Sequence, residues 1–506
     1  MSQGTDNKPS TAPAPETAAT FASLDPRTGK VLAEYPIHDL DDVTAAVKRA
    51  RDASVWWAAL GFDGRKKWLQ KWKSAIARDA QSLAEVMSAE TGKPIDDAVL
   101  EIMLAVEHLD WASKNAGKVL GRKKVPSGMV SVNQEATLYY QPFGVVGVIG
   151  PWNYPVFTPM GSIAYALAAG NAIVFKPSEL TPGVGAWLAD KWKALVPNQP
   201  VFQVVTGLGA TGGALVEAGV DKIAFTGSGP TAKKVMAACA KTLTPMVAEG
   251  GGKDAMLVAA DADLDAAAGF AVFGGMGNAG QTCVGVERIY VADEVYDAFV
   301  RKLTDKASRL RVGGAKDSSY GPMTLDRQNA IVKGQVEDAL DKGAHALLGG
   351  RESLREPYID PVILGDVPED STAMTEETFG PMLAVNRMRD LEDGVEKANA
   401  ANFGLAASIF TKDKARAVRA AENLRTGMVS INSVLGFAGV AALPFGGVGE
   451  SGFGRIHGAD GLREFARTKS VTRQKFNAPL NLLTMERKAR DMKIAAWMLK
   501  TLHGKG

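Results

Sequence analysis

The chain has 506 residues, more than one hydrophobic core normally serves, so we expect two or three domains. Its formal net charge of +2 argues against nucleic acid as the main partner, and its five scattered histidines form no metal-spaced cluster. Two cysteines exclude a disulfide framework and indicate a cytoplasmic chain, and no segment has the roughly 18 uninterrupted apolar residues of a membrane span.

The chain opens on a polar, proline-rich stretch, so we expect a disordered tail over residues 1–20. From about Phe21 to Gly117 apolar residues recur at spacings of three and four, which predicts helices. One of these helical runs stops at Gly92 and Pro94, both typical helix terminators.

Short apolar strands alternate with helical segments from residue 143 to residue 251. This alternation predicts a parallel sheet with helices on both faces. The segments WNYP, KPSE and FTGS follow strands, at the sheet edge where such folds bind ligands. GLGATG, residues 207–212, matches the dinucleotide fingerprint but follows the third strand and lacks the acidic residue about 20 positions later. It is either a pyrophosphate loop or a turn.

A second α/β segment follows, with strands in AMLVAA, ERIYVA, YIDPVIL and MVSIN. The segments VSVNQEATLYY and SVTRQK predict edge strands that belong to neither core. We found no internal repeat.

Cys283 is preceded by glycine and small residues in GNAGQTC and followed by an apolar, β-rich run. A catalytic thiol needs an accessible, polarising niche, which this segment suits. The alternative is a small buried core residue, the usual environment of a free cysteine. For Cys239, inside the helical segment VMAACAKTL, we expect that buried environment.

Two further positions suit acid–base and electrostatic roles. Glu249 ends a strand before three glycines, as a mobile general base would, although a solvated turn acid has the same pattern. Asn153 lies between Pro151 and Pro155, which suits a fixed amide donor or an ordinary Asx turn.

Two strand ends suit a nucleotide. Lys176 and Glu179 in KPSE suit a ribose diol, or form an exposed ion pair of little energetic consequence. Gly227 and Ser228 precede a helix that begins near Pro230, so backbone amides there suit a phosphate, an N-cap, or both.

Seven motifs occur in one order: PWNYP, KPSE, FTGSGP, EGGGK, GNAGQTC, EETFGP and LPFGGVGESGFGR. This set resembles the NAD(P)-dependent aldehyde dehydrogenase superfamily over residues 21–472, nearest the fatty, benzaldehyde and coniferyl aldehyde branch. The resemblance implies an α/β fold with a Rossmann-like cofactor domain, a second α/β catalytic domain and a small β oligomerisation hairpin. The implied boundaries are 21–125 and 143–251 for the NAD-binding domain, 126–142 and 466–478 for the oligomerisation strands, and 252–465 for the catalytic domain.

The resemblance also implies residue roles. Cys283 would be the nucleophile, Glu249 the general base, and Asn153 an oxyanion donor beside the backbone N–H of Cys283. The nucleophile would form a thiohemiacetal and then a thioester, which water activated by the base would hydrolyse. The implied cofactor-binding residues are Trp152, Lys176, Ser178, Glu179, Gly209, Gly227, Ser228, Glu377 and Phe379. A homodimer or homotetramer is implied, and we expect no metal.

The sequence departs from the family pattern at two places. Gly250 stands where a bulky aliphatic residue is common, so we expect a looser strand end after the base. GSGPTA lacks the usual glycine of the phosphate helix and has Ala232 there, which leaves the pyrophosphate position less well defined. Because the Glu179 carboxylate would repel a 2′-phosphate, we expect NAD, with NADP as the alternative.

The substrate channel is predicted to be apolar. Residues 433–443 carry no charge, and Thr158 and Gly161 are small where the channel wall should lie. We therefore expect an aromatic or a medium- or long-chain aliphatic aldehyde. The alternatives are a succinic semialdehyde dehydrogenase, a CoA-acylating aldehyde dehydrogenase, and a non-catalytic dinucleotide-binding structural protein. A cysteine hydrolase is disfavoured because no histidine lies in the motifs around the thiol.

Residues 479–506 predict a basic C-terminal helix. Its apolar stripe consists of Met485, Ala489, Met492, Ala496 and Leu499, with Arg487, Lys488, Arg490 and Lys493 elsewhere. Such a helix either makes peripheral contact with an anionic membrane or docks on protein. We expect a cytoplasmic protein, with membrane association as one of these two alternatives.

Overall fold

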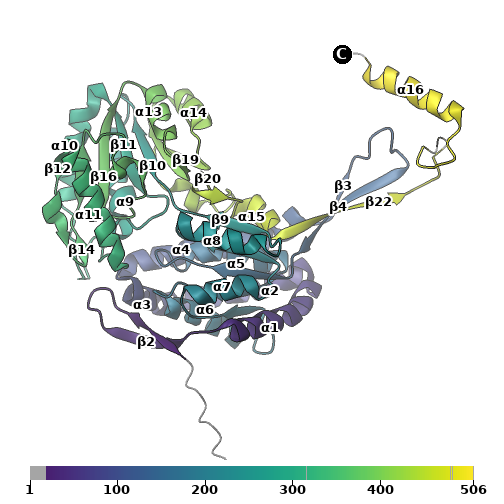
Figure 1. Ribbon diagram of the computed structural model, residues 1–506, viewed down its shortest axis with the longest axis horizontal. Helices are drawn as coiled ribbons and strands as arrows, with labels where there is room; N and C mark the ends of the chain where they lie inside the picture. Colours follow the sequence, from purple (N-terminus) through teal and green to yellow (C-terminus); the bar gives the residue numbers. More distant parts are fainter. Residues whose placement is uncertain (1–18, 315, 479, 481, 505–506) are drawn as a thin grey trace, which may run out of the picture.

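The computed structural model describes residues 19–314, 316–478, 480 and 482–504. Two α/β bodies lie against each other, and a slender arm projects from one of them (Figure 1). Most of the predicted tail over residues 1–20 lies outside the described residues, and its last residue, Thr20, begins a strand.

The first body is built on a six-stranded sheet with the order β21-β9-β8-β5-β6-β7. Strands β9, β8, β5, β6 and β7 pair in parallel, and β21 pairs antiparallel with β9 at one edge. Because the chain leaves β5 in one direction to β6 and later returns to β8 on its other side, a ligand crevice is expected at the carboxyl end of β5. The strands are β5 (Val145–Ile149), β6 (Ala172–Lys176), β7 (Phe202–Val204), β8 (Lys222–Thr226), β9 (Met246–Glu249) and β21 (Gly452–Phe453).

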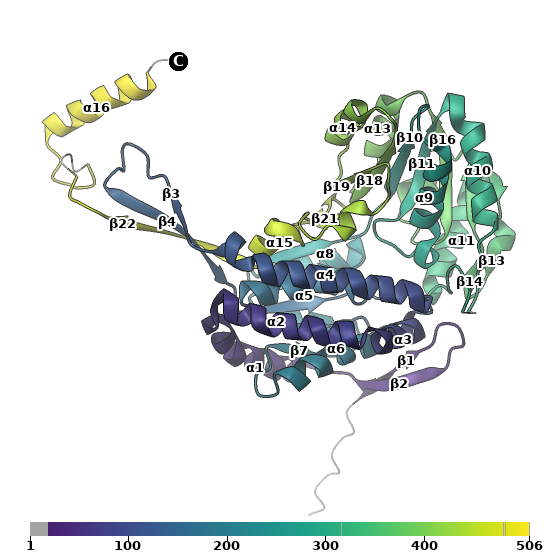
Figure 2. The same ribbon diagram turned by 180° about the vertical axis from the view of Figure 1, so that it is seen from behind.

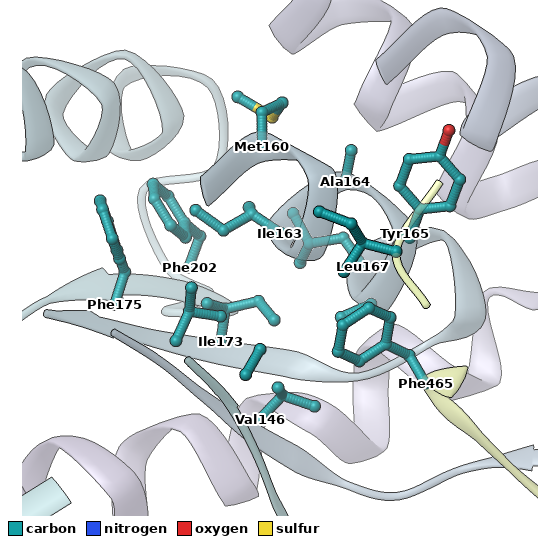
Figure 3. Packing of buried hydrophobic residues seen from close by; sticks show 14 of the residues in the cluster. Val146, Met160, Ile163, Ala164, Tyr165, Leu167, Ile173, Phe175, Phe202 and Phe465 are labelled. Atoms are coloured by element: carbon teal, nitrogen blue, oxygen red, sulfur yellow. The ribbon is translucent and has the colours of Figure 1, made fainter. Parts of the chain in front are cut away.

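Helix α5 (Phe157–Ala169) lies at the centre of this body, and every one of its residues is buried. A helix that is apolar on all sides must be surrounded by protein. Figure 3 shows Ile163 and Leu167 on α5 above Ile173 and Val146, with Phe175 to one side. Seven further helices surround the sheet: α1 (Leu40–Ala59), α2 (Gly61–Arg78), α3 (Ala80–Thr91), α4 (Ile95–Leu120), α6 (Pro182–Leu195), α7 (Gly209–Glu217) and α8 (Gly229–Ala240).

The second body contains a seven-stranded sheet with the order β12-β15-β16-β11-β10-β18-β19. All of its pairings are parallel except that of β12 with β15. Its strands are β10 (Asp254–Val258), β11 (Val286–Ala292), β12 (His345–Leu348), β15 (Val362–Gly365), β16 (Met382–Met388), β18 (Ala406–Phe410) and β19 (Met428–Ile431). Its helices are α9 (Leu264–Met276), α10 (Tyr296–Ser308), α11 (Asp326–Asp341), α12 (Thr372–Thr375), α13 (Leu391–Asn399) and α14 (Lys414–Asn423). The predicted fold of two α/β bodies on parallel sheets is therefore confirmed.

The arm is an antiparallel three-stranded sheet of β22 (Ala466–Gln474), β4 (Gln134–Pro142) and β3 (Lys123–Val125). Strands β4 and β22 overlap the two segments predicted as edge strands, residues 130–140 and 470–475, whereas β3 is an additional strand that precedes the implied boundary at residue 126. Helix α15 (Gly458–Glu464) leads into β22, and helix α16 (Ala489–His503) lies beyond the far end of the arm (Figure 2). Within the part of the chain described, every helix is too short or too polar to cross a bilayer.

The structure differs from the predicted helical pattern at the N-terminal end. β1 (Thr20–Leu24) and β2 (Val31–Pro36) form an antiparallel hairpin where helix was expected from Phe21. The hairpin is held by a tertiary contact, since the Ser23 hydroxyl donates to Glu90 Oε1 at 2.7 Å. Short-range periodicity does not report such a contact.

A second difference concerns YIDPVIL, which is interrupted at Pro361. β14 (Tyr358–Ile359) pairs with β13 (Leu354–Arg355), while β15 joins the large sheet. Proline cannot donate to a sheet ladder, so it separates the two strands. Another small pair joins β17 (Phe403–Gly404) to β20 (Val448–Gly449).

Candidate active site

A cavity of about 670 Å³ opens at the carboxyl edge of the six-stranded sheet. Loops that follow β5, β6, β8 and β9 line it from one body, and the segment before β11 closes it from the other. Twelve residues singled out in the sequence all line this cavity: Trp152, Asn153, Lys176, Ser178, Glu179, Gly209, Gly227, Ser228, Glu249, Cys283, Glu377 and Phe379. The structure therefore brings together segments that are more than 200 residues apart.

Cys283 is presented by a strained loop. Asn278, Ala279 and Gly280 all have left-handed backbone conformations, with φ of 54°, 56° and 70°. At Gly280 only glycine fits, because a Cβ atom would lie 2.1 Å from the carbonyl oxygen of Gly380. Such strain persists only where surrounding contacts hold it, and the Asn278 amide supplies one by donating to the Asn153 carbonyl at 3.1 Å.

Glu249 ends β9 and faces the thiol. Its side chain is buried, and neither carboxylate oxygen has a hydrogen-bond partner of normal geometry among the described residues. Burial raises the pKa of Glu249 to about 7, and the nearby Cys283 thiol opposes that shift. The solvated turn acid considered from the sequence is therefore wrong.

Burial, followed by the charge of Glu249, raises the pKa of the Cys283 thiol well above its usual range. At neutral pH the Cys283 thiol therefore keeps its proton. A carboxylate whose pKa is near 7 is suited to accept that proton when the sulfur bonds to carbon. Cys239, by contrast, is buried in α8, as predicted.

The strand end after Glu249 is held more firmly than the sequence suggested. β21 pairs with β9 at Glu249, and the Gly250 amide donates to the Ser451 carbonyl at 3.0 Å. A Cβ atom at position 250 would lie 2.8 Å from the Glu450 carbonyl oxygen. The expectation of a looser strand end is therefore wrong: glycine is required there because another strand approaches closely.

Asn153 is fixed by contacts at both its amide and its carbonyl. Its side-chain nitrogen donates to the Gln281 carbonyl at 3.0 Å, which leaves one amide hydrogen for another acceptor. Its backbone carbonyl accepts from the Lys93 ammonium at 2.7 Å, and Lys93 is paired with Glu101 at 2.6 Å. The side chain therefore donates toward the cysteine loop rather than accepting within an Asx turn.

Lys93 and Glu101 were not singled out in the sequence. Both side chains are almost fully buried, and Glu101 Oε1 accepts from the backbone N–H groups of Val156 and Phe157 at 2.8 and 3.1 Å. The pair thus connects α4 to the start of α5 and to the Asn153 loop. No local pattern marks it, because its partners are distant in sequence.

At the other end of the cavity, Lys176 is buried and Glu179 is half exposed. The two charged groups are 3.3 Å apart. Burial lowers the pKa of Lys176, and the Glu179 carboxylate opposes that effect. The arrangement differs from an exposed surface ion pair because the cation is desolvated while the carboxylate still faces the cavity.

The start of α8 also faces this end of the cavity. Ser228 is the N-cap residue, but its hydroxyl contacts Thr231 Oγ1 at 3.0 Å and caps no backbone amide. Gly227 is required beside it, since a Cβ atom would lie 2.9 Å from the Phe225 ring. First-turn amides without a side-chain cap suit an anion such as a phosphate.

The GLGATG segment does not form a separate loop. α7 begins at Gly209, and Gly209, Gly212 and Gly213 line the cavity. A Cβ atom at Gly209 or Gly213 would meet nothing within 4 Å, so these glycines leave open space beside the cavity.

Glu377 and Phe379 approach the cavity from the second body. Glu377 Oε1 accepts from the Gly252 amide at 3.1 Å, and burial, followed by the charge of Glu287, raises the pKa of Glu377 to about 8. The Phe379 ring lies edge-on to Trp152 with centroids 5.5 Å apart.

This loop is held by a second buried ion pair that the sequence did not reveal. The ammonium of Lys253 lies 2.8 Å from Glu287, whose carboxylate accepts from the backbone amides of Thr378 and Phe379. Leu325, Arg327 and Gln328, near the start of α11, also line the cavity and were missed. Among the described residues, no group of three His, Cys, Asp or Glu side chains is placed to hold a metal ion.

Comparison with known proteins identifies the family. The sequence matches the profile described as "Aldehyde dehydrogenase family" over residues 14–471. The chain belongs to the aldehyde dehydrogenase family. It is 38% identical over 450 residues to a 4,4'-diapolycopene aldehyde oxidase from Methylomonas sp, covering 88% of this chain and 84% of that protein.

Other aldehyde dehydrogenases are nearly as similar. A putative succinate-semialdehyde dehydrogenase [NADP(+)] 2 from Mycobacterium ulcerans is 34% identical over 457 residues, covering 89% of this chain and 88% of that protein. The crystal structure of lactaldehyde dehydrogenase from Escherichia coli has a TM-score of 0.87 at 30% identity, covering 91% of this chain and 96% of that one. The chain is therefore an oxidoreductase that acts on aldehydes with NAD or NADP, and the non-catalytic structural alternative is set aside.

Proposed function

We propose that this aldehyde dehydrogenase oxidises an apolar aldehyde to the carboxylic acid with NAD. The observation that carries this proposal is the juxtaposition of Cys283 and Glu249 in one cavity. Glu249 raises the pKa of the Cys283 thiol, and the thiol lowers the pKa of Glu249. A thiol and an unpaired buried carboxylate together provide a nucleophile and a base.

In the first step, Cys283 loses its proton toward Glu249 while its sulfur bonds to the carbonyl carbon of the aldehyde. The carbonyl oxygen becomes an oxyanion of a thiohemiacetal. The free amide hydrogen of Asn153 and the backbone N–H of Cys283 would donate to that oxygen, a contribution of roughly 3–4 kcal/mol per donor. Lys93 keeps the Asn153 loop in place.

The bound dinucleotide would supply a hydride acceptor, which leaves a thioester on Cys283. Glu249, which has by then released the first proton to solvent, takes a proton from a water molecule as the water oxygen bonds to the thioester carbon. The carbon–sulfur bond breaks, the carboxylic acid leaves, and the sulfur takes the proton from Glu249, which restores the thiol.

The cavity suits a dinucleotide. Lys176 and Glu179 would hold the adenosine ribose, and the uncapped first turn of α8 would hold the pyrophosphate. Glu377 and Phe379 would position the nicotinamide end. We favour NAD because a 2′-phosphate would approach the Glu179 carboxylate. The alternative is NADP, which the name of the Mycobacterium relative specifies.

Two observations support an apolar substrate. The segment 433–443 has no charge that would pair with a carboxylate. The name of the Methylomonas relative specifies an aldehyde of diapolycopene, a hydrocarbon chain. Other relatives are named for succinate semialdehyde and lactaldehyde, which are polar substrates.

One panel of aldehydes tests this preference: benzaldehyde, coniferyl aldehyde, decanal and succinic semialdehyde, each with NAD and with NADP. We expect the highest kcat/KM with an apolar aldehyde and NAD. A higher value for succinic semialdehyde would reject the apolar channel while leaving the aldehyde chemistry intact.

A CoA-acylating activity is the main enzymatic alternative. Glu249 favours water, because hydrolysis of the thioester needs a base at that position. Products formed in the presence of CoA decide the point: free acid supports hydrolysis, and acyl-CoA in excess over acid reverses the assignment.

We also propose that the enzyme is cytoplasmic and works as a homodimer or homotetramer. The sheet of β3, β4 and β22 extends away from both bodies and leaves β3 as an edge strand with a free side. Such an edge suits pairing with a second copy. A single monomeric mass in solution would reject this assembly.

A further inference from the structure

Positive charge is concentrated in the arm and the C-terminal segment. Residues 122–142 and 466–506 contain 13 of the 58 lysines and arginines but only 3 of the 56 aspartates and glutamates. Their formal net charge is therefore +10, and the remaining 444 residues carry −8. The difference in net charge between these two segments and the rest of the chain points to an anionic partner for the arm.

Helix α16 exposes a large apolar surface. None of its side chains is buried, and Met492, Trp497, Leu499 and Leu502 are between 41% and 66% exposed. Residues at four-residue spacing share a face of a helix, which places Ile494, Met498 and Leu502 together, with Leu499 adjacent. The apolar surface is therefore continuous.

The opposite side of α16 is basic. Lys493 and Lys500 are two turns apart on that side, and no acidic residue follows Asp491 in the described part of the helix. Trp497, one turn after Lys493, lies on the same side. Lysine with interfacial tryptophan is the composition of helices that lie in a membrane surface.

The position of α16 fits this composition. The arm carries the helix away from both α/β bodies, beyond the end of the three-stranded sheet (Figures 1 and 2). Arg467, Lys469 and Arg473 on β22 are exposed along the same arm. Met485, just before the helix, is also exposed.

We propose that α16 binds the surface of an anionic membrane, with its apolar face in the boundary between headgroups and acyl chains. Lys493 and Lys500 then contact the anionic headgroups, and the α/β bodies remain in water. This contact requires neither the aldehyde nor the dinucleotide. A second copy of the chain, whose bodies are acidic, is the competing occupant.

Co-sedimentation of the full-length protein with lipid vesicles tests the proposal. We expect binding to mixed phosphatidylglycerol–phosphatidylcholine vesicles at low salt, weaker binding at high salt, and little binding to phosphatidylcholine alone. The double variant Lys493→Glu, Lys500→Glu should lose about tenfold or more in partition coefficient. The control Lys48→Glu, Lys414→Glu reverses two exposed charges outside the arm and should bind like the wild type.

Three outcomes would overturn the proposal. The first is equal sedimentation with and without phosphatidylglycerol, and the second is equal binding by the wild type and the variant. The third is a change of oligomeric mass in the variant without lipid, which would assign α16 to a second copy of the chain. Unchanged oxidation of a water-soluble aldehyde shows that the variant is folded.

Discussion

The Lys93 ammonium lies 2.6 Å from a Glu101 carboxylate oxygen, and both side chains are about 1% exposed. The same ammonium donates to the Asn153 carbonyl at 2.7 Å. A buried ion pair is costly to break, because removal of one partner leaves the other charge without compensation. The pair therefore couples the stability of the first body to the position of the proposed oxyanion donor.

Glu101→Gln should lower both the stability of the protein and its turnover rate. Loss of one charge of the buried pair is expected to cost about 3–5 kcal/mol, measured from the midpoint of urea unfolding. kcat should fall as well, because the Asn153 loop loses its support. The control Asp460→Asn removes an exposed pair with Arg463 and should cost less than about 1 kcal/mol. Equal effects of the two substitutions would contradict the role of the Lys93–Glu101 pair in stabilising the first body and supporting the Asn153 loop.

Asn153→Ala should lower kcat by about 10²–10³ through loss of the side-chain donor. The aldehyde KM should change little, since the donor acts on charge that develops in the transition state. Steady-state kinetics with the best aldehyde checks both values. A rise in KM alone would show that Asn153 binds the ground state.

The pH dependence of kcat should reflect the ionisation of the Glu249 carboxyl group. Because its pKa is raised to about 7, the carboxyl group is a base only above that pH. kcat of the wild type should therefore fall as pH decreases through about 7. In Glu249→Gln, kcat should be low and lack that inflection. An unchanged profile in the variant would assign the titration to another group.

Glu90 provides a prediction about stability. Burial raises its pKa to about 7, although the Ser23 hydroxyl and two backbone amides donate to it. A folded-state pKa above the unfolded value means that the folded protein retains this proton longer. The resulting stabilisation is present at low pH and is lost as pH rises from the ordinary value of 4.5 toward about 7.

The loss is on the order of 3 kcal/mol by linkage, and urea midpoints across this pH range measure it. Glu90→Gln cannot titrate, so its midpoint should depend less on pH than that of the wild type. A wild-type slope of the opposite sign would contradict the assignment.

Glu179→Gln should shift cofactor preference toward NADP. The substitution removes the carboxylate that would repel a 2′-phosphate while keeping the length of the side chain. We expect the ratio of kcat/KM for NAD to that for NADP to fall by about tenfold. The exposed Glu352→Gln is the matched control. If the ratio stays constant, Glu179 does not discriminate between the cofactors.

Much of the cavity could be predicted because its residues stand in short motifs at strand ends. Parallel strands bring their carboxyl ends to one edge, so WNYP, KPSE and FTGS were expected to meet there. The position of Cys283 opposite Glu249 depended on the family resemblance, since the two lie on different bodies.

The supporting ion pairs could not be predicted. Lys93 with Glu101 and Lys253 with Glu287 acquire their roles from tertiary contacts and have no periodic signal. The N-terminal hairpin was missed for the same reason, since Ser23 contacts Glu90 from 67 residues away. At Gly250 the sequence led to a wrong prediction. The absence of a side chain suggested a loosely held strand end, but the close approach of the Glu450 carbonyl requires glycine there.

The central claim is that Cys283 carries the acyl group. Intact-protein mass spectrometry of Glu249→Gln, after prolonged incubation with an apolar aldehyde and NAD, measures this directly. Without the base, the Cys283 thiol loses its proton only to solvent and the thioester forms slowly, but hydrolysis of the thioester should be slower still, so the acyl group accumulates. We predict a mass increase equal to the acyl group, located on Cys283 by peptide mapping and absent from Cys283→Ala. NADH formed without an adduct on Cys283, or with the acyl group on Cys239, would contradict the account.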